Sequence, residues 1–237
     1  MRRFFIRQPL FTGAQPSLSN DQIHYLLHVL RIRQGNTVLL FNGQHGEWHA
    51  ECREKSRKGI SLHVTHQERP QPTRPTLLYC FAPVKHTRLD YMIQKAVEMG
   101  VGILQPVMTH YTQAMQLNPK RMYANAIKAA EQCGILSVPD CRRIISFDTL
   151  LATWDPIRHL IFCDETAESY EPFPPLRKLV KGPIGIIIGP EGGFDNKERE
   201  SLQALDYVIT ISLGPRILRA DTAAVAALAI INTILKY

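Results

Sequence analysis

The stretch Ile188-Gly189-Pro190-Glu191-Gly192-Gly193-Phe194 begins with the last residue of an apolar run, Ile184–Ile188, which has the composition of a buried β-strand. Its three glycines and its proline let the backbone turn sharply and approach a ligand closely, and ligands of α/β sheets bind where parallel strands end. The stretch is not Gly-x-Gly-x-x-Gly, and it lacks the Gly-Lys-Ser/Thr of a phosphate-binding loop. Taken by itself, it indicates either a ligand-binding loop or a tight turn.

A second loop, Leu213-Gly214-Pro215-Arg216-Ile217-Leu218-Arg219-Ala220-Asp221-Thr222-Ala223, joins the expected strand Tyr207–Leu213 to an apolar final helix. Asp221 or Thr222 is a suitable N-cap for that helix. Two arginines flank an apolar pair, an arrangement that can hold a cation over an anion while the apolar side chains pack against a flat ring. The alternative is an arginine-capped turn with the apolar pair in the core, and spacing alone does not separate the two.

Apolar strands and amphipathic helices alternate through the larger, C-terminal part of the chain. The expected strands are Leu77–Val84, Ile103–Met108, His159–Cys163, Ile184–Ile188 and Tyr207–Leu213, and the expected helices are Thr87–Gly100, Pro119–Cys133, Lys197–Leu205 and Thr222–Lys236. This alternation predicts an α/β domain with a parallel sheet covered on both faces. The final helix is apolar nearly all round, so we expect it to be buried, in part against a second subunit.

The N-terminal part has a different character. Ser19 and Gln22 are placed to form a capping box for a helix running to about Arg31. The strand-like segments that follow are Thr37–Phe41, Glu47–Arg53 and Ile60–His66. Short strands with little helix predict a small β-barrel. The segment Glu68–Pro75 has three prolines and no apolar residue, which is typical of a stiff linker. We therefore predict two domains, residues 1–70 and residues 71–237.

The 237-residue chain carries its excess positive charge at one end. Residues 1–75 contain 11 Lys and Arg against 5 Asp and Glu, whereas the remainder contains 17 against 16. A basic small domain attached to a nearly neutral larger one indicates a polyanion-binding appendage, with a generic basic surface as the alternative.

Several classes of protein are disfavoured. No apolar run approaches the ~20 residues of a membrane helix, and Arg7–Pro9 interrupts any signal-peptide core, so we expect a cytoplasmic protein. The five cysteines are far apart, with no Cys-x-x-Cys pair, which predicts reduced thiols. His24 and His28 have a spacing that can hold a metal, but no carboxylate or cysteine is placed to complete such a site, and we expect none.

Together, the two loops resemble the signature loops of the trefoil-knot (SPOUT) methyltransferases. More narrowly, they resemble those of the ribosomal small subunit methyltransferase E family, which makes N3-methyluridine in 16S rRNA. Upstream segments that agree with this family are His28–Arg31, Lys85, Arg88, Gln94–Val101 and Glu131–Cys133. The resemblance spans essentially the whole chain in order. Asp221 stands where the family usually has Glu, which shortens a carboxylate arm, and Cys133 stands where Ser is common.

The resemblance implies a knotted α/β domain, a PUA-like N-terminal barrel, a homodimer with active sites near the subunit interface, and S-adenosylmethionine as cofactor. It places a bent cofactor among backbone groups and apolar side chains of the two loops, with Asp164-Glu165 as a third wall. The implied cofactor-binding residues are Ile188, Gly189, Pro190, Glu191, Gly192, Gly193, Leu213, Gly214, Ile217, Leu218, Arg219 and Thr222.

The chemistry suggests further roles. Loss of the uracil N3 proton spreads negative charge onto O2 and O4, which we expect Arg219 to stabilise, with Arg216 as a second donor. Glu131 is a candidate proton acceptor, and the alternatives are a helix-surface ion pair for this residue and solvent as the base. The candidate contacts to RNA of the small ribosomal subunit are Arg2, Arg3, Arg7, His28, Arg31, Arg33, Lys85 and Arg88.

Three rival functions have different weaknesses. A non-enzymatic RNA-binding protein would explain the basic domain but not the two loops. A nucleotide-dependent metabolic enzyme would explain the sheet and the glycines, but the dinucleotide-binding fingerprint is missing from the sequence. A 2′-O-ribose or tRNA methyltransferase would share both loops, so it is the nearest alternative.

Overall fold

The chain folds into two compact units. The computed structural model describes residues 1–56, 59–84, 86–113, 117–167, 173–177, 179 and 182–235. The small unit consists of Met1–Arg74 with Ala130–Val138, and the large unit of Pro75–Ala129 with Pro139–Tyr237. Lys85, a predicted RNA contact, and Lys236, the predicted end of the final helix, lie outside the described residues.

The division between the units falls after Arg74, a few residues beyond the predicted boundary at residue 70. Part of the linker groups with the small unit because linker side chains form hydrogen bonds with Ala130–Val138, the segment from later in the chain that also belongs to this unit. Arg69 Nη2 donates to Gly134 O at 2.9 Å, and Gln71 Nε2 donates to Ser137 Oγ at 3.2 Å. No local sequence pattern marks such a recruitment.

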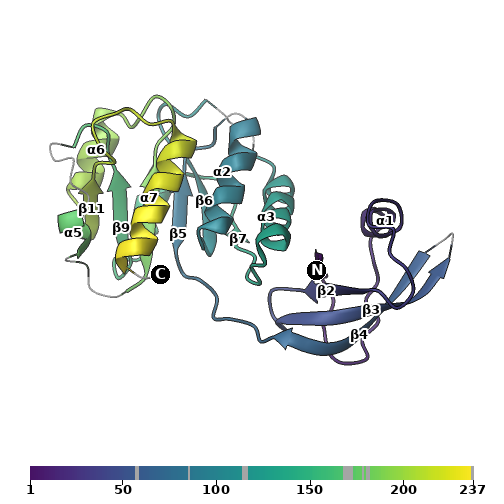
Figure 1. Ribbon diagram of the computed structural model, residues 1–237. Coiled ribbons are helices and arrows are strands. Elements are labelled where there is room, and N and C mark those ends of the chain that lie inside the picture. Colours follow the sequence, from purple (N-terminus) through teal and green to yellow (C-terminus); the bar gives the residue numbers. More distant parts are fainter. Residues whose placement is uncertain are drawn as a thin grey trace. The chain divides into compact units, whose positions relative to one another are not determined.

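The small unit is built on a four-stranded sheet in the order β1 (Arg3–Phe5), β2 (Thr37–Phe41), β3 (Glu47–Ser56) and β4 (Gly59–Arg69) (Figure 1). β1 and β2 run parallel, and the other neighbours run antiparallel. Gly13 N donates to Val64 O, and Val64 N donates to Ala14 O. These bonds join the segment after β1 to the opposite edge strand, in the manner of a small barrel.

The helix of the small unit begins with the predicted capping box, because the Ser19 and Gln22 side chains each accept from the other's backbone N–H. α1 (Asn20–His24) then widens into a π-helical turn, η1 (Tyr25–Val29), which a period of 3.6 residues does not predict. Leu30 N donates to Tyr25 O, five residues back. Arg31 follows with φ of +50°, a left-handed conformation that ends the helix.

The large unit contains a parallel sheet. Its strands lie in the order β11 (Val208–Ile211), β9 (His159–Cys163), β10 (Ile184–Ile188), β5 (Leu78–Phe81), β6 (Ile103–Met108) and β7 (Asp140–Cys141), and β8 (Ile145–Ser146) pairs with β6. All the strand pairs of this unit that lie in the described ranges are parallel. The predicted α/β class with a parallel sheet is therefore confirmed.

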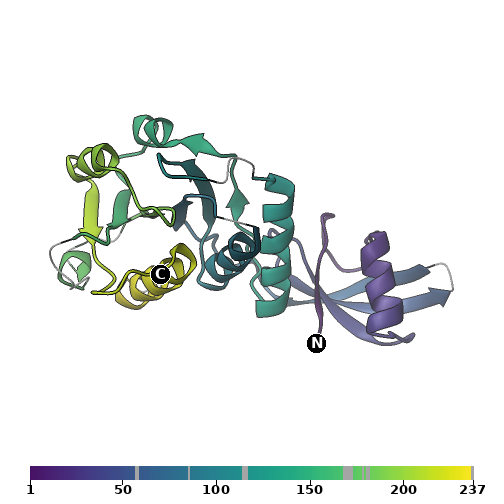
Figure 2. The same ribbon diagram turned by 90° about the horizontal axis from the view of Figure 1, so that it is seen from above.

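Helices cover both faces of this sheet, as Figures 1 and 2 show. α2 (His86–Glu98) and α7 (Ala220–Leu235) pack together on one face, toward which Tyr79 points, and its hydroxyl donates to Met92 Sδ at 3.0 Å. α4 (Phe147–Ala152) and α6 (Asn196–Gln203) cover the opposite face, where Cys80 is buried. The other helices described are α3 (Pro119–Cys133) and α5 (Phe173–Arg177).

The final helix begins earlier than predicted. Because α7 starts at Ala220, Asp221 and Thr222 lie in its first turn, and the expectation that one of them is the N-cap is wrong. The Asp221 carboxylate still lies where the helix dipole favours a negative charge. One face of α7 is buried through Ala227, Leu228 and Ile231, whereas its outer apolar residues are half-buried in the single chain. Across the described residues, we find no helix with the length and apolarity needed to cross a membrane.

Candidate functional site

Three loops meet at the carboxyl edge of the sheet because their strands, β11, β9 and β10, are parallel neighbours. Between the loops lies an open pocket at the surface. It is lined by Cys163, Asp164, Glu165, Ile188, Gly189, Pro190, Gly193, Leu213, Gly214, Arg216, Leu218, Ala220 and Ala223.

This pocket brings together most of the residues that the sequence predicted for the cofactor. Those that line it are Ile188, Gly189, Pro190, Gly193, Leu213, Gly214 and Leu218. Those outside the lining are Glu191, Gly192, Ile217, Arg219 and Thr222. Ile217 is 90% exposed, so only Leu218 of the apolar pair faces the pocket. Ile217 and Leu218 therefore do not both pack in the core, and they do not both line the site.

Two glycines of the first loop are required by close neighbours. A Cβ at Gly189 would lie 2.8 Å from Phe194 Cε2, within the same loop. Gly193 has a φ of +71°, and a Cβ there would lie 2.5 Å from Glu165 Oε1, on the loop after β9. A side chain at position 189 would displace Phe194 within the first loop, and one at position 193 would displace the Glu165 carboxylate, so glycine keeps the backbone wall of the pocket compact.

Cys163, Ala220 and Ala223 are walls of the pocket that no sequence motif indicated. Burial, and then the negative charge of Asp164, raise the pKa of the Cys163 thiol well above its ordinary value, so this side chain is a neutral wall and not a nucleophile. Cys163 is the last residue of β9, next to β10, and a register argument would have found it. The two alanines come from the start of α7, where small side chains leave room for a ligand.

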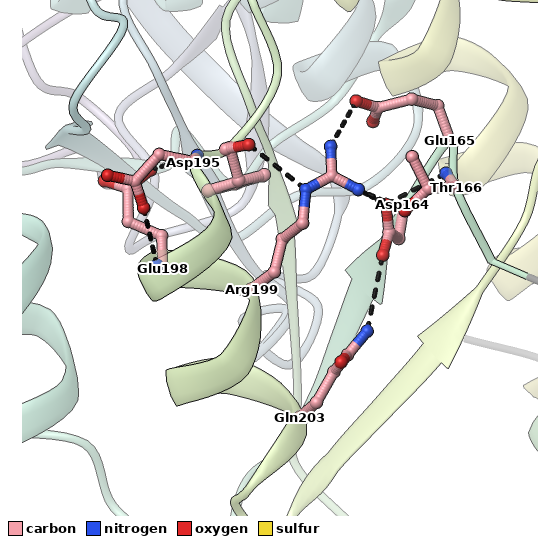
Figure 3. A network of polar contacts seen from close by, with 8 residues as sticks. Asp164, Glu165, Thr166, Asp195, Glu198, Arg199 and Gln203 are labelled. Carbon is pink, nitrogen blue, oxygen red and sulfur yellow. Dashed lines mark hydrogen bonds and ion pairs between the residues drawn. The ribbon is translucent and has the colours of Figure 1, made fainter.

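Arg199, on α6, is the centre of a polar network beside the pocket (Figure 3). Its Nη1 donates to Asp164 Oδ1 at 2.5 Å and its Nη2 donates to Glu165 Oε1 at 2.6 Å. Its Nε donates to Phe194 O at 3.1 Å, and Thr166 Oγ1 is a further partner of Nη1. The Asp164 side chain is 1% exposed and that of Arg199 is 15% exposed, so this ion pair is shielded from solvent. No sequence motif pointed to Arg199.

The two catalytic candidates belong to different units. Arg219 is exposed and directly precedes α7, and its carbonyl accepts a hydrogen bond from Ala223 N at 2.8 Å. Arg216, in the same loop, is exposed and lines the pocket. Glu131 groups with the small unit, where its Oε1 accepts a hydrogen bond from Phe5 N at 2.8 Å.

Most of the candidate RNA contacts are exposed basic residues of the small unit. These are Arg2, Arg7, His28, Arg31 and Arg33. Arg3 is different, because its Nε donates to the buried Glu47 carboxylate at 2.6 Å, which Arg69 also contacts. In the large unit, Arg88 pairs with Glu191 of the first loop at 3.3 Å.

The structure gathers three potential metal ligands at a place that the sequence did not single out. His49, His66 and Glu68, on β3 and β4, have donor atoms within 4.8 Å of one another. His49 Nε2 lies 2.7 Å from Glu68 Oε2, and this pairing accounts for the cluster without an ion.

Comparisons with known proteins define the class. The family described as RNA methyltransferase domain matches residues 70–232, and the family described as RNA methyltransferase PUA domain matches residues 18–65. The class is therefore that of RNA methyltransferases with a PUA domain.

Individual relatives define the family more narrowly. A ribosomal RNA small subunit methyltransferase E of Rickettsia conorii is 30% identical over 96% of this chain and 93% of its own length. A crystal structure of a ribosomal RNA small subunit methyltransferase E from Neisseria gonorrhoeae, bound to S-adenosylmethionine, is 27% identical, covers 99% of this chain and 98% of its own, and has a TM-score of 0.85. A putative methyltransferase from Legionella pneumophila, in complex with the same cofactor, is 25% identical, with coverages of 98% and 96% and a TM-score of 0.82. The chain belongs to the ribosomal RNA small subunit methyltransferase E family.

Proposed function

We propose that this chain transfers the methyl group of S-adenosylmethionine to N3 of a uridine in the 16S rRNA of the small ribosomal subunit. The observation that carries the proposal is the pocket formed by the loops after β9, β10 and β11, in a chain that aligns over nearly its whole length with a relative bound to S-adenosylmethionine.

The residues of the pocket fit this cofactor. Backbone groups of Gly189 and Gly214, together with the Ile188, Leu213 and Leu218 side chains, provide polar and apolar contacts for an adenine ring. At another wall, the carboxylates of Asp164 and Glu165 provide negative charge for a ligand that is cationic at sulfur and at its amino group. A site of this composition binds a nucleoside joined to a charged tail.

S-adenosylmethionine supplies an electrophilic methyl group, which the uracil N3 attacks in line, so that positioning provides much of the rate. Loss of the N3 proton puts negative charge on the uracil oxygens. As the N3–C bond then forms, the bond between the methyl carbon and the sulfonium sulfur breaks, and S-adenosylhomocysteine leaves with the sulfur uncharged. Arg219 is the proposed donor to these oxygens, with Arg216 as a second donor. For the proton, the bond that Glu131 accepts from Phe5 supports solvent as the acceptor over this carboxylate.

The small unit is the proposed RNA-binding module. Its exposed cations, which include Arg7, Arg31 and Arg33, supply the charge, and the π-helical turn that carries His28 is a geometry enriched at functional sites. The half-buried apolar residues on the outer face of α7, such as Val225 and Ile230, support a homodimer.

The proposal is tested by transfer of labelled methyl groups from S-adenosylmethionine to small ribosomal subunits that lack their own modifications, with identification of the product nucleoside. N3-methyluridine is the expected product. A ribose-methylated nucleoside, or transfer only to tRNA, would replace the proposed substrate while keeping the methyltransferase class. Absence of both transfer and cofactor binding would refute the function.

A further inference from the structure

We propose that Arg199 is a positioning residue for the cofactor pocket: it clamps the loop after β9 to the loop after β10 and so fixes the Glu165 carboxylate at the wall that faces the cationic end of the cofactor. This inference rests on the proposed function, because it assumes that the pocket binds S-adenosylmethionine.

The clamp joins the loop after β9 to the loop after β10. Along the chain, these two loops are connected only through the crossover between the two strands and through β10 itself. Arg199 donates to Asp164 and Glu165 after β9 and to the Phe194 carbonyl after β10, with all of these contacts between 2.5 and 3.1 Å. Both loops line the pocket, whereas Arg199 itself does not. Arg199 therefore acts on the pocket only through the residues it holds.

The Arg199 side chain is itself held in place before any ligand arrives. It lies on α6, whose N-terminus is fixed by a capping box between Asp195 and Glu198. Glu198 Oε1 also accepts from His110 N at 2.8 Å, which anchors the start of the helix to the loop after β6. A planar guanidinium that is fixed in this way offers donors in set directions, as a lysine ammonium does not.

Asp164 and Glu165 have different tasks within the clamp. Asp164 is 1% exposed, and it also accepts from Thr166 N at 3.0 Å and from Gln203 Nε2 at 3.5 Å, so it serves the network (Figure 3). Glu165 is 41% exposed and lines the pocket. Because Gly193 has no side chain, the Glu165 carboxylate fits directly against the first loop.

The charges of the clamp leave a net attraction for a cation. Two carboxylates and one guanidinium sum to one negative charge at this wall. A ligand with a sulfonium and an ammonium group gains from that charge, and the gain depends on the carboxylate being held where the ligand passes. A neutral ligand of the same adenosine shape gains nothing from it.

The test compares two ligands, S-adenosylmethionine and the neutral 5′-methylthioadenosine, by calorimetric binding to the full chain. We expect Arg199→Met and Glu165→Gln each to weaken S-adenosylmethionine binding by about tenfold or more. Glu165→Gln removes the charge that attracts the cation, and Arg199→Met releases the Glu165 carboxylate from its position. Binding of 5′-methylthioadenosine should change by less than about threefold, because it carries no charge for the wall to attract. The Arg199→Lys variant should bind S-adenosylmethionine with an affinity between those of wild type and Arg199→Met, since lysine keeps the positive charge but lacks the fixed pair of donors of the guanidinium.

Two further variants sharpen the result. The double variant Arg199→Met/Glu165→Gln should bind S-adenosylmethionine no more weakly than the worse single variant, because Arg199 acts through Glu165. Arg142→Met is the matched control: Arg142 pairs with its neighbour Asp140 at 3.2 Å on the surface of the large unit, and its loss should leave both affinities unchanged.

Equal weakening of both ligands by Arg199→Met would mean that Arg199 only supports the fold, and unchanged S-adenosylmethionine binding would remove the role altogether. If Arg199→Met does not fold, Arg199→Lys and Glu165→Gln decide the question by the same comparison of ligands. A wild-type chain that binds neither ligand would instead overturn the proposed function, and this inference with it.

Discussion

Glu131 Oε1 accepts a 2.8 Å hydrogen bond from the backbone N–H of Phe5, 126 residues earlier in the chain. Phe5 is buried and lies on β1, an edge strand of the small unit. A buried donor left without its acceptor costs about 1–3 kcal/mol. The residue that the sequence offered as a proton acceptor therefore has a structural task that explains a carboxylate at this position.

Two variants of Glu131 separate that task from catalysis. Glu131→Gln keeps an acceptor oxygen but cannot take a proton, so we expect its free energy of unfolding within about 0.5 kcal/mol of wild type and its methyl transfer rate within about threefold. Glu131→Ala should lose about 1–2 kcal/mol of stability. Urea unfolding and labelled methyl transfer provide the two measurements. A folded Glu131→Gln protein that is about 100-fold slower would identify Glu131 as the proton acceptor.

Local features of the fold were predictable because they are encoded locally. The bounds of β6, β9, β10 and α3 agree with the expectations from apolar runs and helical periodicity. The capping box at Ser19 was also predictable, since both of its partners lie within one turn. The pocket followed partly from the same logic, because loops after neighbouring parallel strands must meet at one edge.

Interactions between distant segments were not predictable in this way. Exposed and ion-paired arginines look alike in a sequence, so the pairing of Arg3 with Glu47, 44 positions away, could not be predicted, and the RNA contact of Arg3 stays a prediction. Arg199 lies in a helix whose pattern only shows that it is amphipathic. Its partner Asp164 is 35 residues earlier, and only the order of the strands brings them together. These pairings depend on topology, which periodicity does not contain.

The two arginines of the second loop should have separable roles. Arg216 lines the pocket, whereas Arg219 lies outside its lining. We expect Arg219→Ala to lower kcat by about 100-fold or more, as loss of a charge-stabilising donor does, with little change in the Kd for S-adenosylmethionine. Arg216→Ala should instead raise that Kd. Single-turnover kinetics and calorimetry distinguish the two effects. A folded Arg219→Ala protein that methylates at the wild-type rate would refute the catalytic assignment.

The exposed cations of the small unit should determine the salt dependence of RNA binding. A plot of the logarithm of the RNA-binding constant against the logarithm of the salt concentration has a negative slope. We expect the combined Arg7→Gln, Arg31→Gln and Arg33→Gln variant to make this slope shallower by up to about 2, at about 0.7 for each phosphate contact on single-stranded RNA. The matched control neutralises Lys120, Arg142 and Lys197, three exposed cations of the large unit. Equal losses in both triple variants would show that net charge, and not the small unit, drives binding.

The stability of the small unit should depend on pH through Glu47, whose carboxylate is 1% exposed and pairs with Arg3 and Arg69. Burial acts to raise the pKa of this carboxyl, but the hydrogen bonds and charges of Arg69 and Arg3 outweigh it, and the pKa is lowered from 4.5. The unfolded chain therefore binds this proton more readily than the folded one. The stabilisation is complete above the unfolded pKa of 4.5 and is lost as the pH falls through the folded pKa.

Glu47→Gln tests this dependence. At neutral pH we expect it to cost about 2 kcal/mol, less than for a fully buried pair because the Arg3 and Arg69 side chains are 28% and 45% exposed. The difference from wild type should shrink at about pH 3.5, where the carboxyl is protonated in the unfolded chain.

A Trp154→Phe background leaves Trp48, next to Glu47, as the fluorescence reporter of urea unfolding. Glu51→Gln, which removes an exposed pair with Arg53 on the same strand, should cost less than about 1 kcal/mol at either pH. A Glu47→Gln deficit that is the same at both pH values would mean that the substitution disturbs packing and not the charge pairing.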